Sequence, residues 1–238
     1  MNLRAISYDI KFLRGDPMLI LSMMVPLILW ALMHFIFPVL EKVIMGQWNV
    51  DISPYYNQAG TFFLMVIPMM IGMVYGFILL DERDAGIITA ISVTPTGKKG
   101  YLMIRMGMPT ALSLIFIILY LYLLQLTGVL GVFQLIIISI LVSSQSLVLL
   151  LVLGAIAHNK VMGMAISKGF GILLMGPLLD YGLPAPFNWF GAYSPLFWAS
   201  RSLLVESTER FWIYASLTFI FHLLIIWILF RKFTARSD

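Results

Sequence analysis

The sequence predicts an all-α integral membrane protein with six transmembrane helices. Hydrophobic residues make up 61% of its 238 residues and charged residues only 11%, whereas soluble domains average about 25% charged residues. The apolar residues form uncharged runs, and a helix needs about 20 such residues to cross a bilayer. The strands of a transmembrane β-barrel would instead be roughly 10 residues long with alternating polarity. A soluble fold and a barrel are therefore both disfavoured.

The uncharged runs define the predicted spans. Residues 106–157 form one uncharged block about twice as long as one span requires, so the chain must fold back within it. The glycines of residues 127–132 interrupt the Leu/Ile-rich sequence and mark the turn. In the second run, Gly72 and Gly76 permit close helix packing. The predicted spans are residues 18–40, 59–80, 106–126, 133–157, 161–179 and 211–230.

The distribution of basic residues predicts the orientation. With both termini in the cytoplasm, most lysines and arginines lie inside, and only Lys42, Arg201 and Arg210 lie outside. The positive-inside rule favours this topology over its inverse. We therefore expect a multi-pass protein of a cell membrane, in which the net charge of +4 reflects topology and not nucleic acid binding.

The segment before the first span predicts an interfacial helix over residues 1–15. Leu3, Ile6, Ile10 and Leu13 recur at three- and four-residue spacing, with basic residues mostly off that stripe. Such a helix would lie on the inner membrane surface. The alternative is a merely basic tail that enforces the orientation.

A cluster of charged residues follows the second span, and the pattern that comes after it predicts a short amphipathic helix over residues 82–95. Asp81, Glu82, Arg83 and Asp84 stand at the membrane exit, and Ile87, Ile88 and Ile91 then recur at helical spacing. Pro95 ends the pattern because it cannot continue a helix. A helix this short is not stable alone, so its apolar face should dock on the ends of its own spans or on another protein.

The run E-R-D-A-G-I-I-T-A-I-S-V-T-P resembles the signature of type-2 ABC exporter permeases. In that family it forms the coupling helix, which fits a cleft of a cytoplasmic ATPase. Ile87 and Thr89 depart from the family pattern, where a threonine and a second glutamate are usual. The resemblance implies that ATPase contacts come from Glu82, Arg83, Asp84, Gly86, Ile88, Ile91, Val93, Thr94 and Pro95.

The resemblance extends over nearly the whole chain. It implies a second ATPase contact between the fourth and fifth spans, at His158, Asn159 and Lys160. It also implies an external re-entrant segment over residues 183–204, which is too short and too rich in proline for a seventh span. Its expected interfacial residues are Trp189, Tyr193, Pro195 and Trp198. An aromatic-rich external loop is the alternative.

The sequence contains no phosphate-binding motif of its own. The nearest fragment, residues 96–99, lacks the earlier glycine and the Ser/Thr that would hold magnesium. We therefore expect no cofactor in this chain, with ATP and Mg²⁺ on a separate ATPase subunit present in two copies. A second permease chain, identical or related, would complete the complex. Cysteine is absent, and neither a metal site nor acid–base chemistry is indicated in the spans.

Three ionisable residues lie within the predicted spans. Lys168 would either line a water-filled path and attract an anionic substrate group, or snorkel back to the interface. His34 and His222 are expected to pack or to form hydrogen bonds. An intramembrane lipid-modifying enzyme would instead bring all three residues to one pocket.

The expected function is export of an amphiphilic substrate such as a drug, lipid or hydrophobic peptide, powered by the separate ATPase. By overall pattern the chain is most similar to short six-span permeases described as drug or fluoroquinolone exporters. Heme and polysaccharide exporters of the same architecture remain alternatives, because they differ only in cargo. The resemblance places the protein in a prokaryotic plasma membrane.

Overall fold

The computed structural model describes residues 17–92, 97–125 and 130–236. Every regular element in these ranges is a helix, which confirms the all-α fold. The interfacial helix expected over residues 1–15 lies outside the described residues, as do Val93, Thr94 and Pro95. Six helical segments of the described chain are long and apolar enough to cross a membrane: Met24–Trp48, Ser53–Asp84, Gly100–Leu124, Val132–Ile156, Lys160–Gly182 and Thr208–Thr234.

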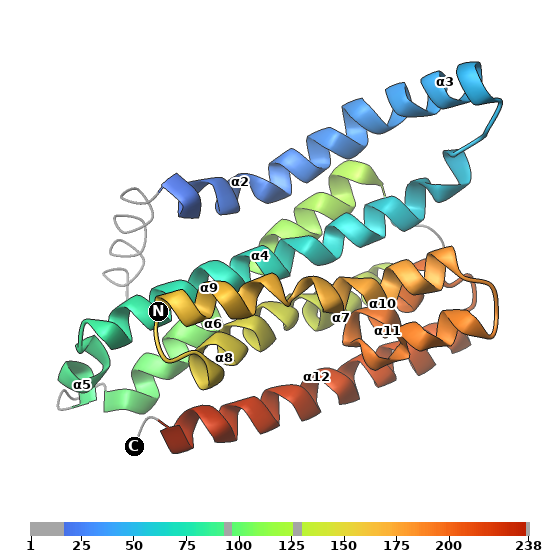
Figure 1. The fold of residues 1–238 in the computed structure, drawn as a ribbon. Coiled ribbons are helices and arrows are strands. Elements are labelled where there is room, and N and C mark those ends of the chain that lie inside the picture. The colour runs from blue at the N-terminus through green and yellow to red at the C-terminus, as the bar shows by residue number, and fades with distance from the viewer. Residues whose placement is uncertain (1–16, 93–96, 126–129, 237–238) are drawn as a thin grey trace.

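The first span consists of α2 (Pro17–Ala31), one π-helical turn (Leu32–Ile36) and α3 (Phe37–Trp48). Pro38 is the second residue after the wide turn, and a residue without a backbone N–H disturbs the regular helical ladder. Asn49 ends α3 in a left-handed conformation, with φ 55°. In Figure 1 this blue helix runs along the outside of the bundle and meets the rest chiefly where α2 packs on α4.

The second span, α4 (Tyr56–Asp84), lies at the centre of the bundle and most of its residues are buried. It begins after a 3₁₀ turn, Ser53–Tyr55, and packs along α8 (Gln145–Ile156) and α6 (Gly97–Leu124). Gly72 makes the packing on α8 close, because a Cβ at this position would lie only 2.3 Å from the carbonyl oxygen of Ser146. The closeness predicted for this glycine is therefore observed.

The fourth span is divided at Ser144 into α7 (Val132–Ser143) and α8 (Gln145–Ile156). The hydroxyls of Ser143, Ser144 and Ser146 each donate to a carbonyl three residues earlier, and such bonds compete with the helical ladder and bend it. Beside the break, the Oε1 of Gln145 lies 2.9 Å from the Nε2 of His222 in α12 (Thr208–Arg236). This buried polar contact ties α8 to α12.

The fifth span is also divided, into α9 (Lys160–Lys168) and α10 (Gly171–Gly182). A 3₁₀ helix (Phe187–Tyr193) and α11 (Pro195–Leu204) follow before α12 begins. In Figure 1, α10 and α11 lie together at the end of the bundle opposite to α5 (Ile87–Ser92). We call these the hairpin end and the α5 end.

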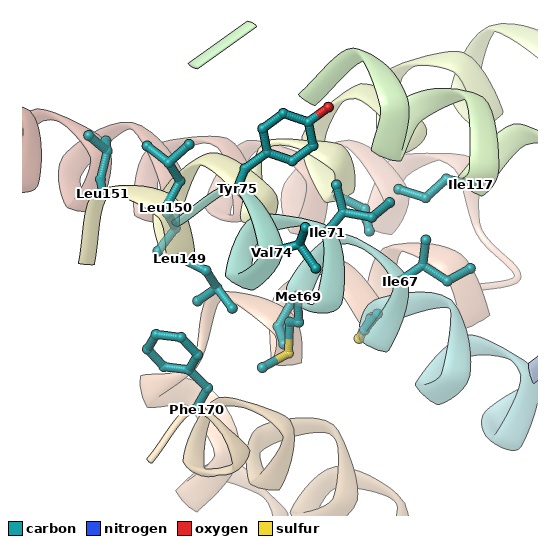
Figure 2. Close-up of a cluster of buried hydrophobic side chains, with 14 of the residues drawn as sticks. Ile67, Met69, Ile71, Val74, Tyr75, Ile117, Leu149, Leu150, Leu151 and Phe170 are labelled. Atoms are coloured by element: carbon teal, nitrogen blue, oxygen red, sulfur yellow. The ribbon is translucent and has the colours of Figure 1, made fainter. Parts of the chain in front are cut away.

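The apolar core is centred on α4. Figure 2 shows Ile67, Ile71 and Val74 of α4 together with Ile117 of α6 and Leu149 of α8. In a bilayer the lipid is as apolar as these side chains, so helices associate through close packing and polar contacts more than through exclusion from water. The glycine contacts and buried polar bonds therefore carry unusual weight in this fold.

Replacing Gly72 with alanine should loosen the contact between α4 and α8. The added Cβ would meet the Ser146 backbone, and overpacking of this kind costs about 1–3 kcal/mol. We expect the unfolding midpoint in lipid nanodiscs to fall by roughly 2–10 °C, measured by thermal denaturation. The matched control is Gly107→Ala in α6, where a Cβ would meet nothing within 4 Å. Equal midpoints for the two variants would contradict the close approach.

Candidate functional site

The α5 end begins with a turn that separates α5 from α4. α4 ends at Asp84, and Gly86 then adopts a left-handed conformation with φ 71°. Glycine adopts this conformation without strain, and it ends helices for this reason. The single helix predicted over residues 82–95 is thus divided, because residues 82–84 form the last turn of α4 and α5 spans only Ile87–Ser92.

The apolar face of α5 docks on the chain's own helices. Ile88 and Ile91 are half-buried and pack against the hydrophobic core, and α5 contacts α4 and α6. Of the two docking partners expected from sequence, the ends of the protein's own spans are the one observed. Asp84, Gly86 and Ala90 are exposed, and Figure 1 shows α5 at the tip of the bundle.

Glu82 is buried and joins α4 to α6. Only 5% of the residue is exposed, and its carboxylate accepts hydrogen bonds from the Nε and Nη2 of Arg105 and from the Tyr101 hydroxyl. The Arg105 Nε lies 2.8 Å from Oε2, and Arg105 is itself buried. A forked arginine–carboxylate pair is among the stronger and more directional contacts in proteins.

Arg83 points in another direction and joins α4 to α8. Its guanidinium donates to the carbonyl oxygens of Gly154 at 3.2 Å and Ala157 at 2.8 Å. α8 ends at Ile156, so these oxygens belong to its C-terminal turn, where carbonyls have no partner within the helix. A positive charge there also interacts favourably with the helix dipole. Arg83 therefore caps α8.

Asp81, the residue before Glu82, joins α4 to a third helix, α9. Its Oδ2 lies 2.8 Å from the Nζ of Lys160, the first residue of α9. Both side chains are about a quarter to a third exposed, so this pair is worth less than a buried one. The preceding residue, Asn159, caps α9 by accepting from the Met162 N–H at 2.9 Å.

Three consecutive residues thus bind three different helices. Successive side chains on a helix point about 100° apart, which directs Asp81 to α9, Glu82 to α6 and Arg83 to α8. We call this arrangement the 81–83 junction. The other predicted contact residues, His158 and Asn159, are exposed in the link between α8 and α9, directly beside it.

At the hairpin end, the predicted re-entrant segment is a helical hairpin packed against the bundle. α11 contacts α12, α10, α7 and α4, and Pro195 and Trp198 are buried in it whereas Trp189 and Tyr193 are exposed. The 3₁₀ helix lies close to α10, because a Cβ on Gly191 would be 2.3 Å from the Gly176 carbonyl oxygen. The segment is therefore helical and packed on the bundle, and its re-entry into the membrane stays a prediction.

The hairpin end contains a partly buried ion pair that sequence analysis missed. The Nη2 of Arg201 lies 2.6 Å from the Oδ1 of Asp180, and its guanidinium is 4.4 Å from the ring centroids of both Trp189 and Phe197. Burial alone would lower the pKa of Arg201, but the hydrogen bonds and charge of Asp180 raise it above the usual value. The signal available in the sequence was a lone arginine within an apolar, aromatic segment.

An open cavity of about 780 Å³ adjoins this pair. Gln58 of α4 contributes to its wall together with Asp180 and Arg201, and residues from the start of α12 complete it. The carbonyl oxygen of the Gln58 side chain is buried without a hydrogen-bond partner among the described residues. α4 therefore connects this cavity with the 81–83 junction.

The three ionisable residues of the predicted spans occupy separate environments. Lys168 is exposed at the end of α9, His34 stacks on Trp30 in the first span, and His222 is buried against Gln145. They do not form the common pocket that an intramembrane enzyme would need. Among the described residues, no group of three or more His, Cys, Asp or Glu side chains is arranged to hold a metal ion.

The buried pair should matter more for stability than the half-exposed one. Arg105→Gln would leave the Glu82 carboxylate buried without its cation, a change that costs about 3–5 kcal/mol. Lys160→Gln removes a partly solvated partner of Asp81 and should cost less than about 1 kcal/mol. Unfolding midpoints of both variants in nanodiscs test this order. Similar decreases in the unfolding midpoint for the two variants would show that the Glu82 site is more hydrated than its geometry indicates.

The comparisons with known proteins identify the family of this chain. A family model described as "Fluoroquinolones export permease protein Rv2686c-like" matches residues 9–230. Fluoroquinolones export permease proteins MT2760 and Rv2686c, from two strains of Mycobacterium tuberculosis, are each 27% identical over 234 residues, covering 96% of this chain and 92% of the relative. No solved structure matches significantly. The chain is a multi-pass membrane protein and belongs to the Rv2686c-like fluoroquinolones export permease family.

Proposed function

We propose that this chain is the membrane-spanning permease subunit of an ABC exporter. The observation that carries the proposal is the position of α5, which projects at the tip of α4 and α6 with Asp84, Gly86 and Ala90 exposed. A short helix held there by its isoleucine face presents its other side to a protein beyond the membrane. The E-R-D-A-G run and the family membership support an ATPase as that protein.

The ATP chemistry belongs to the partner subunit. The sequence carries no phosphate-binding motif of the usual kind, so ATP and Mg²⁺ would bind to two copies of a cytoplasmic ATPase. Each would contact α5 and the exposed link at His158 and Asn159. The α5 end would then face the cytoplasm, with both termini on the same side, in accord with the positive-inside rule.

A second permease chain would enclose the path. The first and fifth spans have many large apolar side chains on exposed faces, among them Phe35, Val161 and Ile172. Lys168 lies on an exposed face too, eight residues after the start of α9 and thus about 12 Å along the helix. A charge at that depth is costly against lipid, whereas a water-filled path between two permease chains would hydrate it.

The proposed cargo is an amphiphilic compound with an anionic group. The M. tuberculosis relatives are named for fluoroquinolone export, and fluoroquinolones carry a carboxylate on an aromatic ring system. Exposed apolar faces with few charges suit the ring system, and Lys168 suits the carboxylate. Whether the second permease chain is identical or related does not alter this chemistry.

Docking of the ATPase on α5 is tested with a single exposed residue. Ala90→Arg places a long charged side chain on the outer side of α5 without entering the core, and should reduce retention of the candidate ATPase about tenfold, which corresponds to about 1.4 kcal/mol. Co-purification and ATP hydrolysis in nanodiscs give the readout. The matched control is Gln47→Arg, also exposed, at the end of α3. Unchanged retention with Ala90→Arg would exclude α5 as the docking site.

The role of Lys168 is tested by removing its charge. Lys168→Gln should slow transport of a fluoroquinolone in proteoliposomes by about tenfold if the ammonium contributes on the order of 1.4 kcal/mol. Transport of the corresponding methyl ester, which lacks the negative charge, should change much less. If neither compound is affected, the lysine snorkels to the interface and takes no part in the path.

A further inference from the structure

We propose that the 81–83 junction is the transmission element of this permease, and that Glu82 and Arg83 are positioning residues inside the chain and not ATPase contacts. The proposal rests on the proposed function, since it concerns how a push on α5 reaches the spans. In this proposal each of the three residues passes the movement of α4 to a different helix. Asp81 acts on α9, Glu82 acts on α6 and Arg83 acts on α8.

A displacement of α5 is transmitted to the 81–83 junction through a hydrogen-bonded turn and through packing on the core. The turn between α4 and α5 is closed by two backbone hydrogen bonds. The Ala85 N–H donates to the carbonyl oxygen of Asp81 at 2.9 Å, and the Gly86 N–H donates to the carbonyl oxygen of Arg83 at 3.0 Å. Ile88 and Ile91 fix α5 against the core. A displacement of α5 therefore moves the last turn of α4 with it.

Glu82 has no surface left for an external partner. The residue is 5% exposed, and both carboxylate oxygens are engaged by Arg105 and Tyr101 of α6. A docked ATPase would have to break this buried set before it could reach the carboxylate, and breaking one partner of such a pair is strongly unfavourable. The glutamate of the E-R-D run thus acts on α6.

Arg83 and Asp81 hold the two sides of one link. Arg83 binds the C-terminal carbonyls of α8, including Ala157, and Asp81 binds Lys160 at the start of α9. The exposed residues between them, His158 and Asn159, form the second proposed ATPase contact. Both proposed contacts, α5 and this link, therefore converge on the same three residues of α4.

The exposed fractions of the side chains indicate how much each ion pair contributes to the transmission of movement. The Glu82–Arg105 pair is buried, with side chains 6% and 7% exposed, whereas the side chains of Asp81 and Lys160 are 25% and 34% exposed. Water and salt weaken the second pair much more than the first. Glu82 should therefore transmit force effectively and Asp81 should contribute little. Arg83 lies between them, because its two bonds to the end of α8 are part-buried.

The test separates binding from transmission in the reconstituted complex of permease and ATPase. For Glu82→Gln and for Arg83→Met we expect ATPase retention like that of the parent chain, with transport per ATP reduced tenfold or more. Asp81→Asn should stay within about twofold of the parent. Arg83→Met leaves no buried carboxylate unpaired, so it serves as the second variant if Glu82→Gln folds poorly. Ala90→Arg is the docking control, because it should lose the ATPase itself.

A spectroscopic readout excludes a merely structural role. The chain has no cysteine, so spin labels can be attached to Gln47→Cys in α3 and Tyr122→Cys in α6, both exposed. α6 is bound by the junction and α3 is not. In the parent complex a non-hydrolysable ATP analogue should shift the distance between the labels. In Arg83→Met and Glu82→Gln that shift should shrink or vanish while the ATPase stays bound.

Each contrary result has a distinct meaning. Loss of the ATPase by Glu82→Gln, to the extent seen with Ala90→Arg, would place Glu82 in the docking surface and overturn the proposal. Parental transport per ATP and a parental label shift in both Glu82→Gln and Arg83→Met would show that the junction transmits nothing. If the parent chain itself retains no ATPase, the proposed function fails, and with it the basis of the inference.

Discussion

The buried pair of Glu82 and Arg105 is the contact on which the arrangement of the α5 end depends. In a bilayer, apolar helices gain little by leaving lipid for one another, so their register is set by close packing and by polar bonds. α4 has both kinds, with Gly72 against α8 and Glu82 against α6. A forked ion pair enclosed by apolar neighbours has one good geometry. It thereby fixes the position of the last turn of α4 against α6, and hence where the turn at Gly86 can place α5.

The sequence predicted the helices far better than the bonds between them. Hydropathy and glycine spacing are local properties, which is why the spans and the close approach at Gly72 could be foreseen. The end of α4 was missed because one left-handed glycine, Gly86, outweighs a helical pattern that continues through it. The partner of Glu82 lies 23 residues away, and no periodicity relates it to Arg105. Glu82 was therefore assigned to an external contact that its burial does not favour.

A carboxylate–arginine ion pair joins neighbouring helices at each end of the molecule. Glu82 pairs with Arg105 at the α5 end, and Asp180 pairs with Arg201 at the hairpin end. Each pair joins a transmembrane helix to a neighbour near an end of the apolar core, and the hydrogen bonds of a forked arginine–carboxylate pair are directional. α4 reaches both, since Gln58 near its start lines the cavity beside Asp180. A helix of 29 residues spans about 43 Å, and α4 therefore connects the two ends as one continuous helix.

The unequal strength of the three bonds determines which parts can move apart. A ligand or partner shifts a conformational equilibrium only by the difference in its contact energy between the two states. α6 and α8 are held to α4 by the buried Glu82 pair and by the cap from Arg83, and should move with it. α9 is held by a partly solvated pair, and the fifth span is broken just beyond Lys168. Of the three polar bonds to α4, that of α9 is thus the weakest, and α9 also presents an exposed charge at Lys168. If this span moves relative to the others, the surface that changes most is the one proposed to meet the cargo.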